Sequence, residues 1–118
     1  MIRGIVDELG VPTIELRIAG RSWTAIIDTG FNGDLEVPTE LFDVLSPRFL
    51  SRIRSNLAGG QTIDEDNYQV AIEFDGQTLA AEATFSPAQE LSIGTHLLRR
   101  HQLQISFVDK TIAINRAG

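Results

Sequence analysis

The feature that most constrains this chain is an apolar segment that runs directly into Asp-Thr-Gly. Residues 25–27 are Ala-Ile-Ile, residues 28–30 are Asp-Thr-Gly and residues 31–33 are Phe-Asn-Gly. The apolar run predicts a buried strand, which would place Asp28 at the floor of a cleft. Gly30 lets the chain turn and approach closely, because it has no Cβ. The two isoleucines would supply the dry surroundings in which two carboxyl groups can share one proton.

Asp-Thr-Gly alone is a weak signal, because the same tripeptide also occurs in surface turns. A second signal lies far downstream, where residues 91–98 read Leu-Ser-Ile-Gly-Thr-His-Leu-Leu. This pattern predicts a short central strand that ends at Gly94, followed by a helix capped by Thr95. With both signals in this order, the chain resembles the retropepsin-like aspartic proteases (clan AA). It looks closest to their small bacterial and archaeal single-domain members, which carry DTGF where retroviral enzymes carry DTGA.

Length and composition narrow the class of protein. A chain of 118 residues predicts one domain, residues 1–118. The sequence has no Cys, so it forms neither a disulfide framework nor a thiolate metal site. Its net charge of −6 argues against nucleic acid as a partner. No apolar run reaches transmembrane length and the first residues lack a signal-peptide core, so we expect a cytoplasmic protein without a membrane partner.

The alternation of apolar and polar residues predicts about eight short strands and two short helices. Ile14, Leu16 and Ile18 alternate with polar residues, and Asp75-Gly76 is a strong hairpin turn. Thr39 is expected to cap the first helix and Thr95 the second. This pattern suits a small closed β-barrel or a sandwich. The resemblance implies an all-β retropepsin-like barrel, the acid protease fold, with one lobe per chain.

The resemblance also implies an aspartic-type endopeptidase, a hydrolase that holds a water molecule between two carboxyl groups. Two carboxyls about 3 Å apart cannot both ionise, so one is protonated while the other acts as base. The sequence offers one Asp-Thr-Gly, and the other aspartates that we compared with it lack this context: Asp7, Asp43, Asp64, Asp66, Asp75 and Asp109. We therefore expect a homodimer in which each chain supplies Asp28, acting on a polypeptide substrate.

Further site residues follow from the resemblance. The Thr29 hydroxyl is expected to reach across the two-fold axis to the partner's Asp-Thr-Gly loop, although it could instead cap its own turn. Gly59 and Gly60 would form the tip of a flap that closes over a substrate bound as an extended strand. The alternative for these glycines is an ordinary flexible hairpin, since the tip has less apolar bulk than retroviral flaps.

Two positions depart from the retroviral pattern. Retroviral enzymes pair an acid four residues after the catalytic Asp with an Arg just after the helix glycine. Here those positions hold Asn32 and Thr95, which predicts a neutral hydrogen bond in place of the ion pair. Phe31 replaces a small residue, so it either narrows the cleft or packs beneath it. With Asn32, Gly59 and Gly60, Phe31 completes the expected substrate-binding set.

No cofactor or metal is expected. His96 and His101 would point in different directions on a helix, so they are better explained as surface or dimer-facing residues than as a metal pair. The acidic run at residues 64–66 lacks the features of an EF-hand loop.

Two rival functions remain open at this stage. One is a protein-binding or dimerisation module that keeps the fold with little or no proteolysis. The other is a structural β-domain in which Asp-Thr-Gly is only a turn. The presence of Asp28 favours the protease over a pure binder, and the element formed by Ile93 and Gly94 argues against the structural domain.

Overall fold

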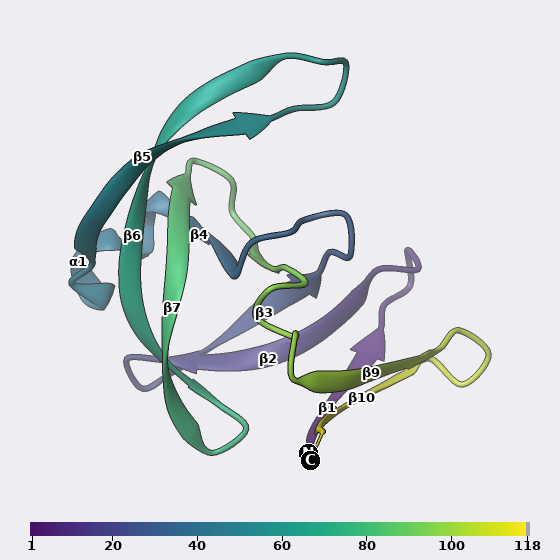
Figure 1. The fold of residues 1–118 in the computed structure, drawn as a ribbon. Coiled ribbons are helices and arrows are strands. Elements are labelled where there is room, and N and C mark those ends of the chain that lie inside the picture. Colours follow the sequence, from purple (N-terminus) through teal and green to yellow (C-terminus); the bar gives the residue numbers. More distant parts are fainter. Residues whose placement is uncertain (118) are drawn as a thin grey trace.

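The structure is a computed structural model that describes residues 1–117. Within this range it contains ten β-strands and one α-helix, which follows a single 3-10 turn (Figure 1). The strands are β1 (Ile2–Val6), β2 (Pro12–Ile18), β3 (Arg21–Ile27), β4 (Leu35–Pro38), β5 (Arg48–Asn56), β6 (Thr62–Phe74), β7 (Gln77–Ser86), β8 (Leu91–Ile93), β9 (His101–Ser106) and β10 (Thr111–Arg116). The 3-10 turn is Thr39–Leu41 and α1 is Phe42–Leu45.

All ten strands belong to one sheet, in the order β5-β6-β7-β4-β8-β3-β2-β1-β10-β9. Neighbours are antiparallel except for two parallel pairs, β3 with β8 and β4 with β7. The edge strands β5 and β9 do not pair, so the sheet is not closed and the expectation of a closed barrel is wrong. The number of short strands predicted from a sequence does not show whether their sheet closes, because closure requires the two edge strands to pair.

Of the two predicted helices, only the first forms in residues 1–117. Thr95 instead begins a series of turns, in which Leu98 N donates to Thr95 O at 3.1 Å and His101 N donates to Leu98 O at 2.9 Å. Leu97 and Leu98 are both buried although they are adjacent. The backbone hydrogen bonds here join residues three apart rather than four, which is the pattern of turns and not of an α-helix. Pro38 rather than Thr39 occupies the N-cap position before the first helical turn, because β4 continues to Pro38.

The core follows the alternation that the sequence predicts. Ile14, Leu16 and Ile18 of β2 are buried, whereas Glu15 and Arg17 between them are exposed. On the strands that lead to and flank the Asp-Thr-Gly segment, β3, β4 and β8, the buried aliphatic residues include Ala25, Ile27, Leu35, Leu91 and Ile93. These side chains give the candidate site a dense and rigid base.

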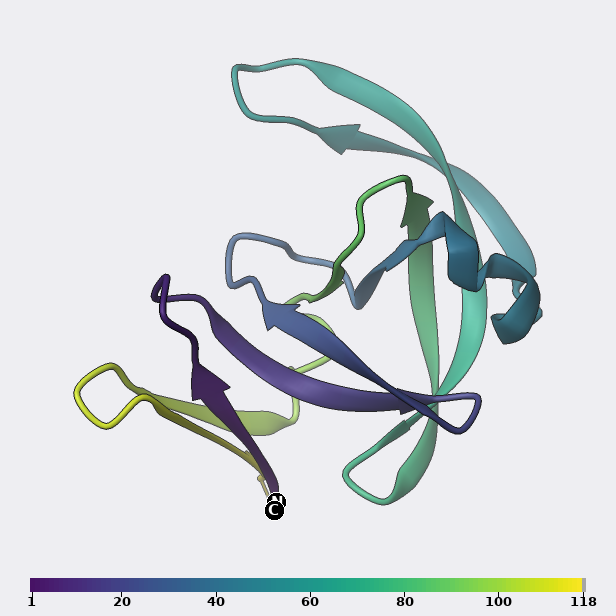
Figure 2. The ribbon, with the colours of Figure 1, turned by 180° about the vertical axis from the view of Figure 1, so that it is seen from behind.

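Two hairpins confirm their predicted turns. Asp75 and Gly76 join β6 to β7, and both have positive φ, 52° and 76°, as a tight two-residue turn requires. The β5–β6 hairpin turns at residues 57–61 and arches away from the rest of the sheet, at the top of Figure 1 and, from behind, of Figure 2. The rings of Phe42, Phe49, Tyr68 and Phe85 pack edge to face where this hairpin meets α1 and β7.

No helix in residues 1–117 is long and apolar enough to span a membrane.

Candidate active site

The two sequence motifs meet because β3 and β8 are parallel neighbours. Ile27 pairs with Ile93, and Asp28 N donates to Ile93 O at 2.9 Å. The chain therefore leaves the sheet at Asp28, level with the point where β8 ends and Gly94 follows. We call residues 28–34 the Asp28 loop. The loop fixes its own carboxylate, since Gly30 N donates to Asp28 Oδ1 at 2.9 Å.

Asp28 itself is exposed in the single chain rather than enclosed at the floor of a cleft. The predicted dry surroundings are therefore not present around the carboxylate, although Ile27 beneath it is buried. Thr29 and Gly30 are exposed as well. In residues 1–117 the Thr29 hydroxyl makes no hydrogen bond, so Thr29 does not cap its own turn.

Three backbone hydrogen bonds tie the Asp28 loop to residues 94–96. Gly94 N donates to Asp34 O at 3.0 Å, Thr95 N to Phe31 O at 2.8 Å and His96 N to Gly33 O at 3.2 Å. A Cβ at Gly94 would collide with the carbonyl oxygens of Gly33 and Phe31. The close approach explains why glycine stands at position 94.

Phe31 folds back over its own loop. Its ring occupies the space into which a Cβ on Gly33 or Gly94 would project. The ring also lines the adjacent cleft and is partly exposed. Phe31 therefore packs against its own loop and also lines the cleft.

A cleft of about 600 Å³ lies between the Asp28 loop and the β5–β6 hairpin. Gly30, Phe31 and Asn32 line one wall, and residues 53–57 of the hairpin line another. Gly59 and Gly60, at the tip, do not line the cleft. Both have positive φ, 86° and 81°, and no atom lies within 4 Å of a Cβ built on either. The hairpin thus stands open in this structure, with its tip clear of the cleft.

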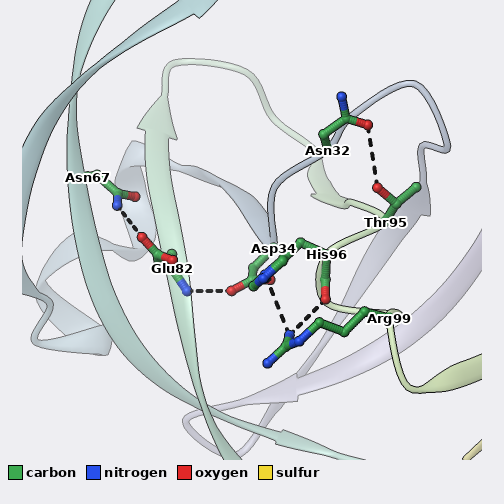
Figure 3. Close-up of polar contacts among 7 residues, drawn as sticks. All are labelled: Asn32, Asp34, Asn67, Glu82, Thr95, His96 and Arg99. Atoms are coloured by element: carbon green, nitrogen blue, oxygen red, sulfur yellow. Dashed lines mark hydrogen bonds and ion pairs between the residues drawn. The ribbon is translucent and has the colours of Figure 1, made fainter.

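The predicted neutral contact between Asn32 and Thr95 is present but long, with Thr95 Oγ1 3.5 Å from Asn32 Oδ1 (Figure 3). A much shorter pair lies beside it. Asp34 Oδ1 is 2.6 Å from His96 Nδ1, and the Asp34 side chain is only 6% exposed. Asp34 Oδ2 accepts a hydrogen bond from Glu82 N at 2.9 Å. Sequence reasoning missed Asp34 and gave His96 no role in the site.

His101 lies outside this cleft, at a smaller cavity of about 200 Å³ near the β6–β7 turn. Its ring packs edge to face on Phe74, with centroids 5.2 Å apart. Burial, together with the nearby Arg116 charge, lowers the pKa of His101 from its usual value, and the Asp75 carboxylate partly opposes this. His96 and His101 do not form a metal pair, and no group of three possible metal ligands occurs in the part of the chain that the structure describes.

Comparison with solved structures identifies the fold. A retropepsin-like aspartic protease from Rickettsia conorii superposes with a TM-score of 0.74 at 15% identity, over 98% of this chain and 89% of the other. The simian foamy virus (mac) protease superposes with a TM-score of 0.58 at 20% identity, over 74% of this chain and 91% of the other. No protein-family model and no curated protein sequence matches the chain.

The fold is therefore that of the retropepsin-like aspartic proteases. The structure combines this fold with an Asp-Thr-Gly loop directly after β3. At these identities the likeness establishes the fold, and activity has to be argued from the site.

Proposed function

We propose that the protein is an aspartic-type endopeptidase, active as a homodimer in which each chain contributes Asp28. The position of Asp28 carries the proposal. Its carboxylate is held by the Gly30 amide, directly after the buried Ile27 at the end of β3 and two residues before the first cleft-lining residue. The retropepsin-like fold supports the same class of activity.

In the proposed reaction, one Asp28 carboxylate takes a proton from a water molecule while the water oxygen attacks the peptide carbonyl carbon. The second Asp28, which is protonated, donates to the carbonyl oxygen. The tetrahedral intermediate then loses its C–N bond, the leaving nitrogen takes a proton from the first Asp28, and a hydroxyl of the intermediate returns a proton to the second Asp28, so that the pair again holds one proton. The products are a new carboxyl group and a new amine.

The cleft suits an extended polypeptide. One wall is backbone of the Asp28 loop and another is residues 53–57 of β5 and the turn after it. β5 is an edge strand, so some of its backbone groups have no partner strand. An extended peptide between these walls would form main-chain hydrogen bonds, as in other cases of strand addition.

The order of the strands supports a dimer face around Asp28. Cross-strand pairs place Ile26, Thr13, Ile5, Thr111 and Ser106 in one row across β3, β2, β1, β10 and β9. The Asp28 loop, residues 7–11 and residues 107–110 therefore leave the sheet along the same edge. This edge carries large exposed apolar side chains, which are Ile5, Leu9, Phe107 and Val108. We propose that a second copy covers this edge and thereby encloses both Asp28 side chains.

The test is cleavage of a mixed pool of unstructured fluorogenic peptides by wild type and by Asp28→Asn. We expect kcat/KM to fall roughly a thousandfold or more in Asp28→Asn, because the dyad loses its base. Circular dichroism and sedimentation should not change, because the substitution preserves size. Asp43→Asn, on α1, is the matched control and should cleave like wild type.

Two other results would redirect the proposal. Wild-type cleavage by Asp28→Asn would remove Asp28 from the chemistry. If neither protein cleaves any peptide and both bind peptides equally well, the protein is a binding module with this fold.

A further inference from the structure

Asp34 is a buried carboxylate in a site where Asp28 is exposed. A buried carboxylate is unfavourable unless hydrogen bonds and charge satisfy it, and here both oxygens are used. Oδ1 meets His96 Nδ1 at 2.6 Å and Oδ2 accepts the Glu82 amide at 2.9 Å. Because an ionised carboxylate only accepts, His96 Nδ1 carries the hydrogen of this bond.

The same two residues are also joined through their backbones to the segments that meet at the site. Asp34 O accepts from Gly94 N, and His96 N donates to Gly33 O. The side-chain bond therefore closes a ring with the backbone bonds between the Asp28 loop and residues 94–96. Such a ring fixes the loop more firmly than the long contact between Asn32 and Thr95, which has neither burial nor charge to strengthen it.

We propose that Asp34 and His96 form a clamp that positions the Asp28 loop, and that this clamp takes the place of the ion pair that retroviral enzymes carry at the positions of Asn32 and Thr95. The partner on the Asp28 loop is displaced by two positions, from 32 to 34, and the partner on the other segment by one, from 95 to 96, so the cross-link is kept at a new place. Asp34 and His96 are positioning residues in this scheme. The expected effect of the clamp on catalysis rests on the proposed function. Its effect on the position of the Asp28 loop does not.

The clamp extends to the base of the β5–β6 hairpin. Glu82 gives its amide to Asp34, and its side chain accepts from Asn67 Nδ2 at 2.6 Å (Figure 3). Asn67 is buried and lies on β6, the strand that forms the falling arm of that hairpin. Arg99 supports the other end, since its Nη1 donates to His96 O at 2.8 Å. The Asp28 loop and the hairpin are thus held by one continuous set of hydrogen bonds.

The test compares His96→Leu with Thr95→Val, which removes the hydroxyl of the Asn32 contact one residue away. The His96 side chain is 48% exposed, but its loss leaves the buried Asp34 carboxylate without a partner, so the measurements are made at a temperature where circular dichroism shows His96→Leu to be folded. We expect amide hydrogen exchange of residues 30–34 to rise at least about tenfold in His96→Leu, while β2 is unchanged. We expect kcat to fall roughly 10- to 100-fold with a much smaller change in KM, since misplacement affects the reacting groups more than binding. Thr95→Val should resemble wild type in both measurements.

Two more variants separate a clamp from general stabilisation. His96→Gln keeps a donor and should recover part of the loss. Asp34→Asn combined with His96→Leu should be no worse than the more damaging single change, because both remove one interaction. Equal exchange in His96→Leu and wild type, or a rise spread over the whole sheet, would overturn the clamp. If wild type cleaves no peptide, the proposed function fails and the exchange measurement still decides the clamp.

Discussion

Ile27 and Ile93 lie opposite each other on the parallel strands β3 and β8, and each is the last residue of its strand. Both strands therefore end at the same level, which brings the residue after Ile27, the candidate catalytic Asp28, beside Gly94. The geometry of the site follows from this one register. Gly94 makes the close contact with residues 31–33 possible, because it has no Cβ.

Gly94→Ala should destabilise the protein by about 1–3 kcal/mol, because the added Cβ meets backbone oxygens of Gly33 and Phe31 that cannot move aside freely. Gly30→Ala is the matched control, because a Cβ at Gly30 meets only Asp28 Oδ1, at 3.3 Å. Urea denaturation measures both. Equal midpoints for the two variants would mean that the contact at Gly94 is loose in solution.

Gly59→Val and Gly60→Val should reduce kcat/KM more than stability. A β-branched residue resists positive φ and stiffens a tip that must move to close over a peptide. Gly76→Val serves as the control, because Gly76 also has positive φ but lies in the β6–β7 turn, outside the cleft. It should lose stability with little loss of kcat/KM. If all three variants cleave equally well at a temperature where they are folded, the hairpin tip has no role in catalysis.

Val108→Lys should weaken the proposed dimer at least about tenfold, or 1.4 kcal/mol, because it places a charge in the apolar edge that we propose a second copy covers. Val108 is 93% exposed, so the monomer should not be affected. Val44→Lys, on α1, is the matched control, and Figure 1 shows α1 on the opposite side of the molecule from the turn between β9 and β10. Sedimentation at a series of concentrations gives both dissociation constants.

Specific activity of wild type should fall on dilution below its dimer dissociation constant. The loss should begin at a higher protein concentration in Val108→Lys than in Val44→Lys. Undiminished specific activity in demonstrably monomeric protein would exclude a site shared between two chains.

Wild type should lose stability in mild acid because of His101, and His101→Gln should lack this part of the loss. The folded chain lowers the pKa of His101 below 6.5, so the unfolded chain takes up the proton first as the pH falls. The free energy of unfolding should therefore decrease as the pH falls from 6.5 to the folded-state pKa, and the loss is complete below it. Chemical denaturation at several pH values between about 7 and 5 measures this slope. Parallel slopes for wild type and His101→Gln would show that another group causes the decrease.

The sequence predicted the strands near the site well, because their patterns are strong. The alternation in β2, the apolar run of β3 and the short strand at Leu91 each have a distinct period and clear ends. Asp75-Gly76 has the chemistry of one specific turn. These local signals predicted the strands that lead to Asp28 and to Gly94, and the structure adds the parallel pairing of β3 and β8 that brings the two together.

Asp34 could not be recognised in the same way. Its position after Gly33 is typical of an exposed turn, and its burial depends on β7, whose Glu82 amide it accepts. His96 was interpreted as a surface or dimer-facing residue rather than a metal ligand, on a helix that does not form. The available signal was the loss of both partners of an expected pair, at Asn32 and Thr95. When both partners of an ion pair are absent, a neighbouring pair of residues can take over the contact.

The clamp also sets the order of events during synthesis. Asp34 and His96 are 62 positions apart, and β1 pairs with β10, the last strand. A nascent chain that has emerged only as far as β7 has the Asp28 loop and the Glu82 amide, but it lacks His96 and the backbone partners at residues 94–96. Contacts so distant along the chain form slowly and late. If the proposed activity is correct, a ribosome-bound fragment that lacks β8 to β10 cannot cleave its neighbours, and peptide hydrolysis begins only after these strands have emerged and folded.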